Sequence, residues 1–216
     1  PPRSVKAQTF DAVGAPGKGL TSARFADDVE YREEAQKGGA ARSATSKLLV
    51  IGFADDIVSR AQFNGAVKFE ERGGISASAA EAQYAPANGG ALQLLSVDAG
   101  GRPRVTNAEI IVEPGQIDVT LQGSTMMAKD DVKTTLRPRK DSKLPGLLKE
   151  GEGANVNATT LEYQRAGGKA IYSGTAALCQ RQTAIRGATG TLAQDKGSPV
   201  ARGAPSPTPQ PVAGQS

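Results

Sequence analysis

The stretch KAIYSGTAALCQRQTAIRG, residues 169–187, alternates small or apolar residues with polar ones and is interrupted by glycine. A period of two is typical of β-strands that have one buried face and one face in water. The same alternation occurs in FNGAVKF (63–69) and IDVTLQG (117–123), and GGRPR, EPGQ and AGGK supply turns between such runs. The sequence therefore predicts an all-β fold.

Two longer segments share one plan, AAEAQYAPANGGALQL (79–94) and ATTLEYQRAGGKAIYS (158–173). In each, a tyrosine follows the first alanine by five residues, a Gly-Gly pair comes next, and an aliphatic residue, Leu92 or Ile171, lies eight after the tyrosine. This order predicts a hairpin with a polar glycine loop. A shorter element, an apolar residue followed two later by Gly or Asp, recurs in FADDV, FNGAV, LQGST and YSGTA. Helix remains an alternative for 27–44, which is rich in charged helix formers, and for the Ala-rich 76–84.

The composition limits both the core and the partners. Of 216 residues, 38% are hydrophobic and 4% aromatic, without tryptophan, which argues against a thick core of large side chains. The net charge of +4 is spread among mixed signs, which favours a solvated surface over a nucleic-acid footprint. The aromatic residues are also too few to form a stacking platform for bases.

Catalytic and metal chemistry find little support in the sequence. There is no histidine, so neither a Ser/His/Asp triad nor a Cys/His pair can form, and the single Cys179 is interpreted as a small buried residue. The doubled acids at Asp27, Asp55 and Asp130 lack the alternating oxygen spacing of a calcium loop. We therefore expect no enzyme, no cofactor and no metal site. No run of 18 apolar residues is present to span a bilayer.

The organisation along the chain follows from composition. Residues 1–20 are rich in Gly, Pro and Ala and are predicted to be a flexible segment, and the Pro/Ser/Gly-rich residues 198–216 a disordered tail. Residues 21–143 are predicted to form a first unit, or units, of β-structure. A second unit, 144–197, continues the same sheet. Its opening LPGLLKEGEG is either a connection between units or an exposed apolar lip.

Residues 154–197 resemble the OstA-like proteins of lipopolysaccharide export, the periplasmic bridge components of the LptA/LptC type. The repeat of that family reads apolar-x-Ala-x-x-Leu-x-Tyr, a loop, an aromatic-x-Gly-x-Ala/Val strand and a Thr-x-Ile-x-Gly/Ala strand. The matching positions here are Val156, Ala158, Leu161, Tyr163, Tyr172, Gly174, Ala176, Thr183, Ile185 and Gly187. Residues 63–95 resemble a more divergent copy, and the segment near Phe25 a third.

The resemblance implies an open β-jellyroll, a folded-over antiparallel sheet of repeated hairpins around an apolar groove. It further implies a periplasmic carrier, with the possibility of an inner-membrane tether outside this chain left open. Such a carrier holds lipopolysaccharide or a similar long-chain lipid and passes it toward the outer membrane. Its partners are other β-jellyroll components, joined by edge-strand addition, and the inner- and outer-membrane export complexes. No nucleic-acid partner is expected.

The inward sets of the predicted strands supply candidate groove-lining residues. They are Phe63, Val67, Phe69, Leu92, Leu94, Val119, Leu121, Ile171 and Ile185. Lipid phosphates would favour basic side chains at the groove mouth, and the candidates are Arg60, Lys68, Arg72, Arg165 and Lys169. The alternative is a structural β-repeat protein, an adhesin or scaffold segment, with a filled interior and no lipid.

Overall fold

The computed structural model describes residues 1–17, 19–35, 39–87, 89–96, 101–137, 152–193 and 202–203. These residues form one antiparallel sheet of 15 strands and a short 3-10 helix, η1 (Arg165–Gly167). The strands are β1 (Arg3–Lys6), β2 (Thr9–Ala15), β3 (Gly19–Glu33), β4 (Arg42–Ala54), β5 (Ile57–Glu71), β6 (Ser76–Ala85), β7 (Ala91–Leu95), β8 (Arg104–Thr106), β9 (Ile110–Glu113), β10 (Gln116–Thr120), β11 (Thr125–Leu136), β12 (Ala154–Gln164), β13 (Lys169–Gln180), β14 (Thr183–Ala193) and β15 (Arg202–Gly203). The predicted all-β class is confirmed. The described part of 27–44 contains the end of β3 and the start of β4, and 76–84 lies in β6, so neither alternative helix forms there.

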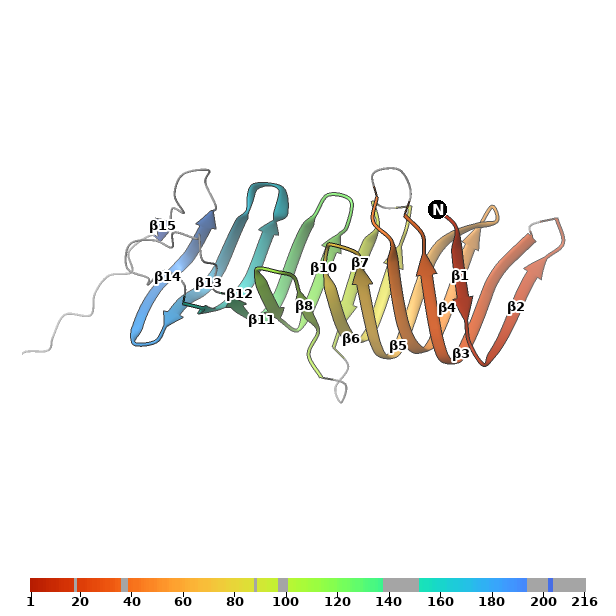
Figure 1. Ribbon diagram of the computed structural model, residues 1–216, viewed down its shortest axis with the longest axis horizontal. Helices are drawn as coiled ribbons and strands as arrows, with labels where there is room; N and C mark the ends of the chain where they lie inside the picture. The colour runs from red at the N-terminus through yellow and green to blue at the C-terminus, as the bar shows by residue number, and fades with distance from the viewer. Residues whose placement is uncertain are drawn as a thin grey trace, which may run out of the picture.

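The sheet is folded over into two layers, so that the long strands contribute one half to each layer (Figure 1). Layer A contains β2, β7 and β10 and the halves of the long strands that pair with them, such as 57–64 of β5. Layer B contains β1, β8 and β9 and the opposite halves, such as 67–71 of β5. In the middle, the circuit β6–β7–β10–β11–β9–β8 returns to β6. The predicted folded-over antiparallel sheet is therefore confirmed, and its middle strands close into a barrel.

Four of the long strands, β3, β5, β11 and β13, pass between the layers at a two-residue bulge in left-handed backbone conformation. The bulged pairs are Asp27 and Asp28 on β3, Gly65 and Ala66 on β5, Asp130 and Asp131 on β11, and Gly174 and Thr175 on β13. The pairing register shifts at each of them, because the two bulged residues lie opposite a single residue of the neighbouring strand. Such bulges bend a strand sharply. Three of these sites belong to the short element that recurs in the sequence, whereas LQGST instead forms the turn between β10 and β11.

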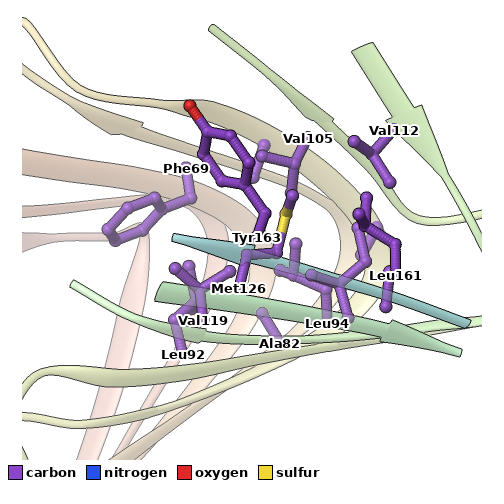
Figure 2. Packing of buried hydrophobic residues seen from close by; sticks show 14 of the residues in the cluster. Phe69, Ala82, Leu92, Leu94, Val105, Val112, Val119, Met126, Leu161 and Tyr163 are labelled. Carbon is purple, nitrogen blue, oxygen red and sulfur yellow. The ribbon is translucent and has the colours of Figure 1, made fainter. Parts of the chain in front are cut away.

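The core lies between the two layers and is closely packed in the middle of the molecule. Val105 of β8 and Val112 of β9 face Leu94 of β7 and Leu161 of β12 across the interior (Figure 2). Leu94, Val112 and Leu161 are fully buried. Alternation decides this arrangement, because every second residue along each strand points inward.

The two predicted hairpins form as expected. Tyr84 on β6 pairs with Leu92 on β7, and Tyr163 on β12 pairs with Ala170 on β13. The strands β12 to β14 continue the sheet from β11, as expected for the second unit. Residues 144–151, which include most of LPGLLKEGEG, lie outside the described residues.

The N-terminal residues differ from expectation. In place of the flexible segment predicted over 1–20, the structure has β1 and β2, which together pair along β3. Strand pairing uses backbone groups and needs few large side chains, which is why a Gly/Ala-rich composition misled the prediction. Of the predicted C-terminal tail, only 202–203 are described, and they form β15 beside Gly190 and Thr191 of β14.

Candidate functional site

Most predicted groove residues are packed inside the molecule. Seven of the nine belong to the core and expose at most 7% of their surface. These seven are Phe63, Val67, Phe69, Leu92, Leu94, Val119 and Leu121. They face inward as the alternation predicted, but in the structure they contact other side chains. The interior around them is therefore filled.

Ile171 lies on the opposite face from the other candidates. It alternates with buried Ala170 and Tyr172 and pairs with exposed Glu162, so its side chain is on the outer face. The cause is the loop before it. Tyr163 pairs with Ala170, seven residues later in the sequence, whereas Tyr84 pairs with Leu92, eight residues later. A shift of one residue moves a side chain to the other face of a sheet.

Ile185 lines a pocket at the C-terminal end of the fold, where the interior is open. The pocket has a volume of about 60 Å³ and lies between β12, β13 and β14. Its apolar wall is formed by Val156, Tyr172, Ala176, Leu178, Ile185 and Leu192. Ile185 and Leu192 are half-buried, in contrast to the core residues further along the sheet. This end of the interior can accept an apolar group.

A basic residue contributes to the wall of this pocket and was not among the sequence candidates. Arg186 is exposed and contributes to the pocket wall, but it alternates with Ile185 and pairs with Ala177, so its side chain starts on the outer face of β14. The guanidinium of arginine binds carboxylates and phosphates well. The sequence could have indicated Arg186, because it directly follows the groove candidate Ile185 in TAIRG, residues 183–187.

A larger hollow, with a volume of about 290 Å³, lies at layer A over β5, β6, β7 and β10. Its wall combines the polar residues Arg60, Gln83, Gln93 and Asp118 with the apolar residues Tyr84, Ala85, Ala91, Leu92 and Val119. The Gln93 amide donates a hydrogen bond to Asp118 Oδ1 at 2.7 Å. The wall is therefore mixed in character, and the groove candidates Leu92 and Val119 form part of it.

The predicted phosphate contacts do not form one cluster. Arg60 and Lys68 are exposed and alternate with inward residues of β5, so they lie on the outer faces. Lys169 is likewise exposed beside inward Ala170. Arg165 of η1 donates a hydrogen bond to the Gly73 carbonyl at 2.9 Å, which joins its hairpin to the turn that carries Arg72. Of the five candidates, only Arg165 and Arg72 are brought close together. They lie at the edge where the hairpin turns of the two layers meet, which is called the mouth here.

A row of alternating charges crosses layer B at the same mouth. Arg3, Glu33, Arg42 and Glu71 are register partners on β1, β3, β4 and β5. Glu33 is 4% exposed and accepts hydrogen bonds from Arg3 at 2.8 Å and Arg42 at 3.1 Å. Arg42 also donates to Glu71 at 3.0 Å. The row is therefore a paired ionic network.

Two tyrosines complete the network, and one of them crosses between the layers. Tyr31 and Tyr84 each donate a hydrogen bond to Glu33, both at 3.1 Å, and Arg42 donates to the Tyr84 hydroxyl at 2.9 Å. Burial by itself raises the pKa of Glu33, but the hydrogen bonds and charge of Arg3 and the two tyrosine hydroxyls outweigh burial and hold the pKa below its ordinary value. Burial and the charge of Glu33 raise the pKa of Tyr84 to about 12. Because Tyr84 belongs to layer A, these bonds tie the two layers together.

The described residues offer no group of three or more His, Cys, Asp or Glu side chains that could hold a metal ion. The doubled acids are explained by backbone geometry. Asp27 and Asp28, like Asp130 and Asp131, occupy left-handed bulges, and Asp55 and Asp56 form the turn between β4 and β5. Aspartate tolerates this conformation better than most residues. Cys179, which was expected to be buried, is instead a half-buried free thiol on the outer face of β13, because it alternates with the buried Leu178 and Gln180.

Across the described part of the chain, no helix has the length and apolar character needed to cross a membrane. Neither a protein-family model nor a curated protein sequence matches the chain.

Proposed function

We propose that this chain is a non-enzymatic lipid-binding module that holds an acyl chain at the C-terminal end of its folded-over sheet. The observation that carries the proposal is the apolar pocket between β12, β13 and β14, which opens where the core ends. Each methylene that leaves water contributes about 0.8 kcal/mol, so an acyl chain can be bound without a specific polar contact. An anionic head group would lie near Arg186.

The resemblance of residues 154–197 to the OstA-like bridge proteins supports lipopolysaccharide or a similar long-chain lipid as the ligand, and the periplasm as the compartment. The strand edges are consistent with docking by strand addition. On β14, residues 183–189 have no partner beyond β13 within the described ranges, and β1 and β2 pair only with β3 among those residues. An open edge is a template for another strand.

A structural β-repeat protein remains the second candidate function, and one observation favours it. Seven predicted groove residues are packed into a filled core, as expected of a scaffold that binds no lipid. The two candidates differ at the pocket: a lipid-binding module takes up an acyl chain there, whereas a scaffold does not.

The test is binding of a fluorescent fatty acid to the purified chain, followed by competition with lipopolysaccharide. The expected result is saturable binding that lipopolysaccharide displaces and that its delipidated polysaccharide leaves unchanged. Replacement of Arg186 by Gln should weaken binding of the anionic fatty acid more than binding of its methyl ester. Absence of saturable binding for both probes would favour the scaffold.

A further inference from the structure

We infer that the interior of this molecule is divided, and that a lipid held at the C-terminal pocket cannot pass along the sheet to the N-terminal end. The inference rests on the proposed function. It adds that the chain has a one-ended binding site, closed by the network of Arg3, Glu33, Arg42, Glu71 and Tyr84.

The network closes the mouth between the layers, alongside the route that an acyl chain would follow along the sheet. Glu33 and Arg42 are register partners on the inner face of layer B, and their side chains are 4% and 10% exposed. The Tyr84 hydroxyl reaches them from layer A, with hydrogen bonds at 2.9 Å to Arg42 and 3.1 Å to Glu33. A methylene chain in this place would separate paired charges and offer no hydrogen bond in return.

Aromatic side chains fill the space directly beneath the network. Tyr31 and Phe63, from opposite layers, pack edge to face with ring centroids 5.7 Å apart. Phe69 and Tyr84, also from opposite layers, have centroids 6.3 Å apart. All four side chains are at most 2% exposed. An acyl chain could enter this part only by displacing aromatic rings from a close-packed core.

The two ends of the sheet are nevertheless both apolar. At the N-terminal end, Phe10 of β2 stacks on Phe25 of β3 with centroids 6.0 Å apart and is 70% exposed. At the C-terminal end lies the pocket that contains Ile185 and Leu192. The filled core between them, which includes the fully buried Val112, Ile117 and Leu161, separates the two apolar ends.

The experiment is photolabelling of the purified full chain with a diazirine-bearing palmitate. Labelled residues are mapped by mass spectrometry, with and without an excess of unlabelled palmitate as competitor. The expected result is competable label confined to β11–β14, residues 125–193. Label that persists in the presence of competitor is non-specific and is subtracted at every position, including the exposed Phe10.

The possible outcomes separate the two claims. Competable label in the filled core between the two ends, at Phe63 or Phe69, overturns the division of the interior. If β11–β14 are labelled as well, lipid binding at the C-terminal pocket stays in place. No competable label anywhere overturns the proposed function and the division with it. A second arm uses Tyr84→Phe, which removes the bond between the layers. Label at Phe63 or Phe69 in this variant, but not in the original chain, would identify the network as the barrier.

Discussion

At the scale of single residues, the hydroxyl of Tyr84 is the contact that joins charges of layer B to layer A. It is buried and bonded to both Arg42 and Glu33. We expect Tyr84→Phe to lower the free energy of unfolding by about 1–3 kcal/mol, because it leaves buried charged groups short of a partner. Urea unfolding monitored by circular dichroism measures the change.

Tyr172 provides the matched control for this substitution. Its hydroxyl is buried and, among the described residues, has no hydrogen-bond partner of normal geometry. Burial raises the pKa of Tyr172 to about 12, although the nearby Thr134 hydroxyl opposes the shift. Tyr172→Phe should therefore leave stability nearly unchanged or raise it slightly. Equal losses for the two variants would contradict the role assigned to Tyr84.

Glu33 makes the stability depend on pH in a defined direction. Its pKa in the folded chain lies below the ordinary value of 4.5, so its stabilising effect is present above that value and is lost as the pH falls through the folded pKa. Glu33→Gln should thus be strongly destabilising at pH 7, and its deficit relative to the original chain should shrink below pH 4.5.

The measurement is urea unfolding of both chains at neutral and acidic pH. Glu30→Gln is the control, because the ion pair of Glu30 with Arg32 is largely exposed and contributes little. A deficit for Glu33→Gln that stays constant down to pH 3 would contradict the ionic network.

Residue burial in this network could not be predicted from the sequence. Glu33 lies in a charged run that also suited a solvated helix, and its partners Arg3 and Arg42 are 30 and 9 residues away. Only the folded sheet places them in one row.

By contrast, seven groove candidates were correctly predicted to face inward, because alternation along a strand is a local property. Whether the interior around them is empty or filled depends on the distance between layers, which no local pattern contains.

At the scale of elements, the bulges that fold β3, β5, β11 and β13 are the decisive feature. Gly174 has a φ of +76°, and a Cβ atom added there would lie 2.6 Å from Thr159 Cβ on the neighbouring β12. We expect Gly174→Ala to destabilise the chain by about 1–3 kcal/mol, from left-handed backbone strain and from this clash.

Gly167 is the matched control, because its Cβ would meet no atom within 4 Å and its φ is not in the left-handed region. Gly167→Ala should leave the midpoint of thermal unfolding nearly unchanged, while Gly174→Ala lowers it. If both variants melted at the same temperature as the original chain, the bulge at Gly174 would not be needed for the fold.

The hairpins and the recurring short element were visible in the sequence, whereas their exact register was not. Both Tyr and Gly-Gly segments form hairpins, and FADDV, FNGAV and YSGTA mark bulges between the layers. AKDDV, at 128–132, forms a further bulge with the same geometry, and its doubled acid was the available signal. Ile171 went to the outer face because one hairpin loop is a residue shorter than the other, a difference that the shared sequence plan conceals.

At the scale of the whole molecule, a single core joins the two units predicted from the sequence. Phe69 and Leu94 from the first unit and Leu161 and Tyr172 from the second belong to the same buried cluster. We therefore expect one cooperative unfolding transition, with the calorimetric enthalpy equal to the van't Hoff enthalpy. Two separate transitions in differential scanning calorimetry would show that the units fold independently.

The most direct test of the account is the affinity of the fluorescent fatty acid for two variants of neighbouring residues. Ala176 faces the pocket, whereas Ala177 alternates with it and lies on the outer face of β13. Ala176→Val fills space that about two methylenes would occupy, so binding should weaken roughly tenfold. Ala177→Val should bind as the original chain does. Equal affinity of all three chains would contradict an acyl-chain site between β12, β13 and β14.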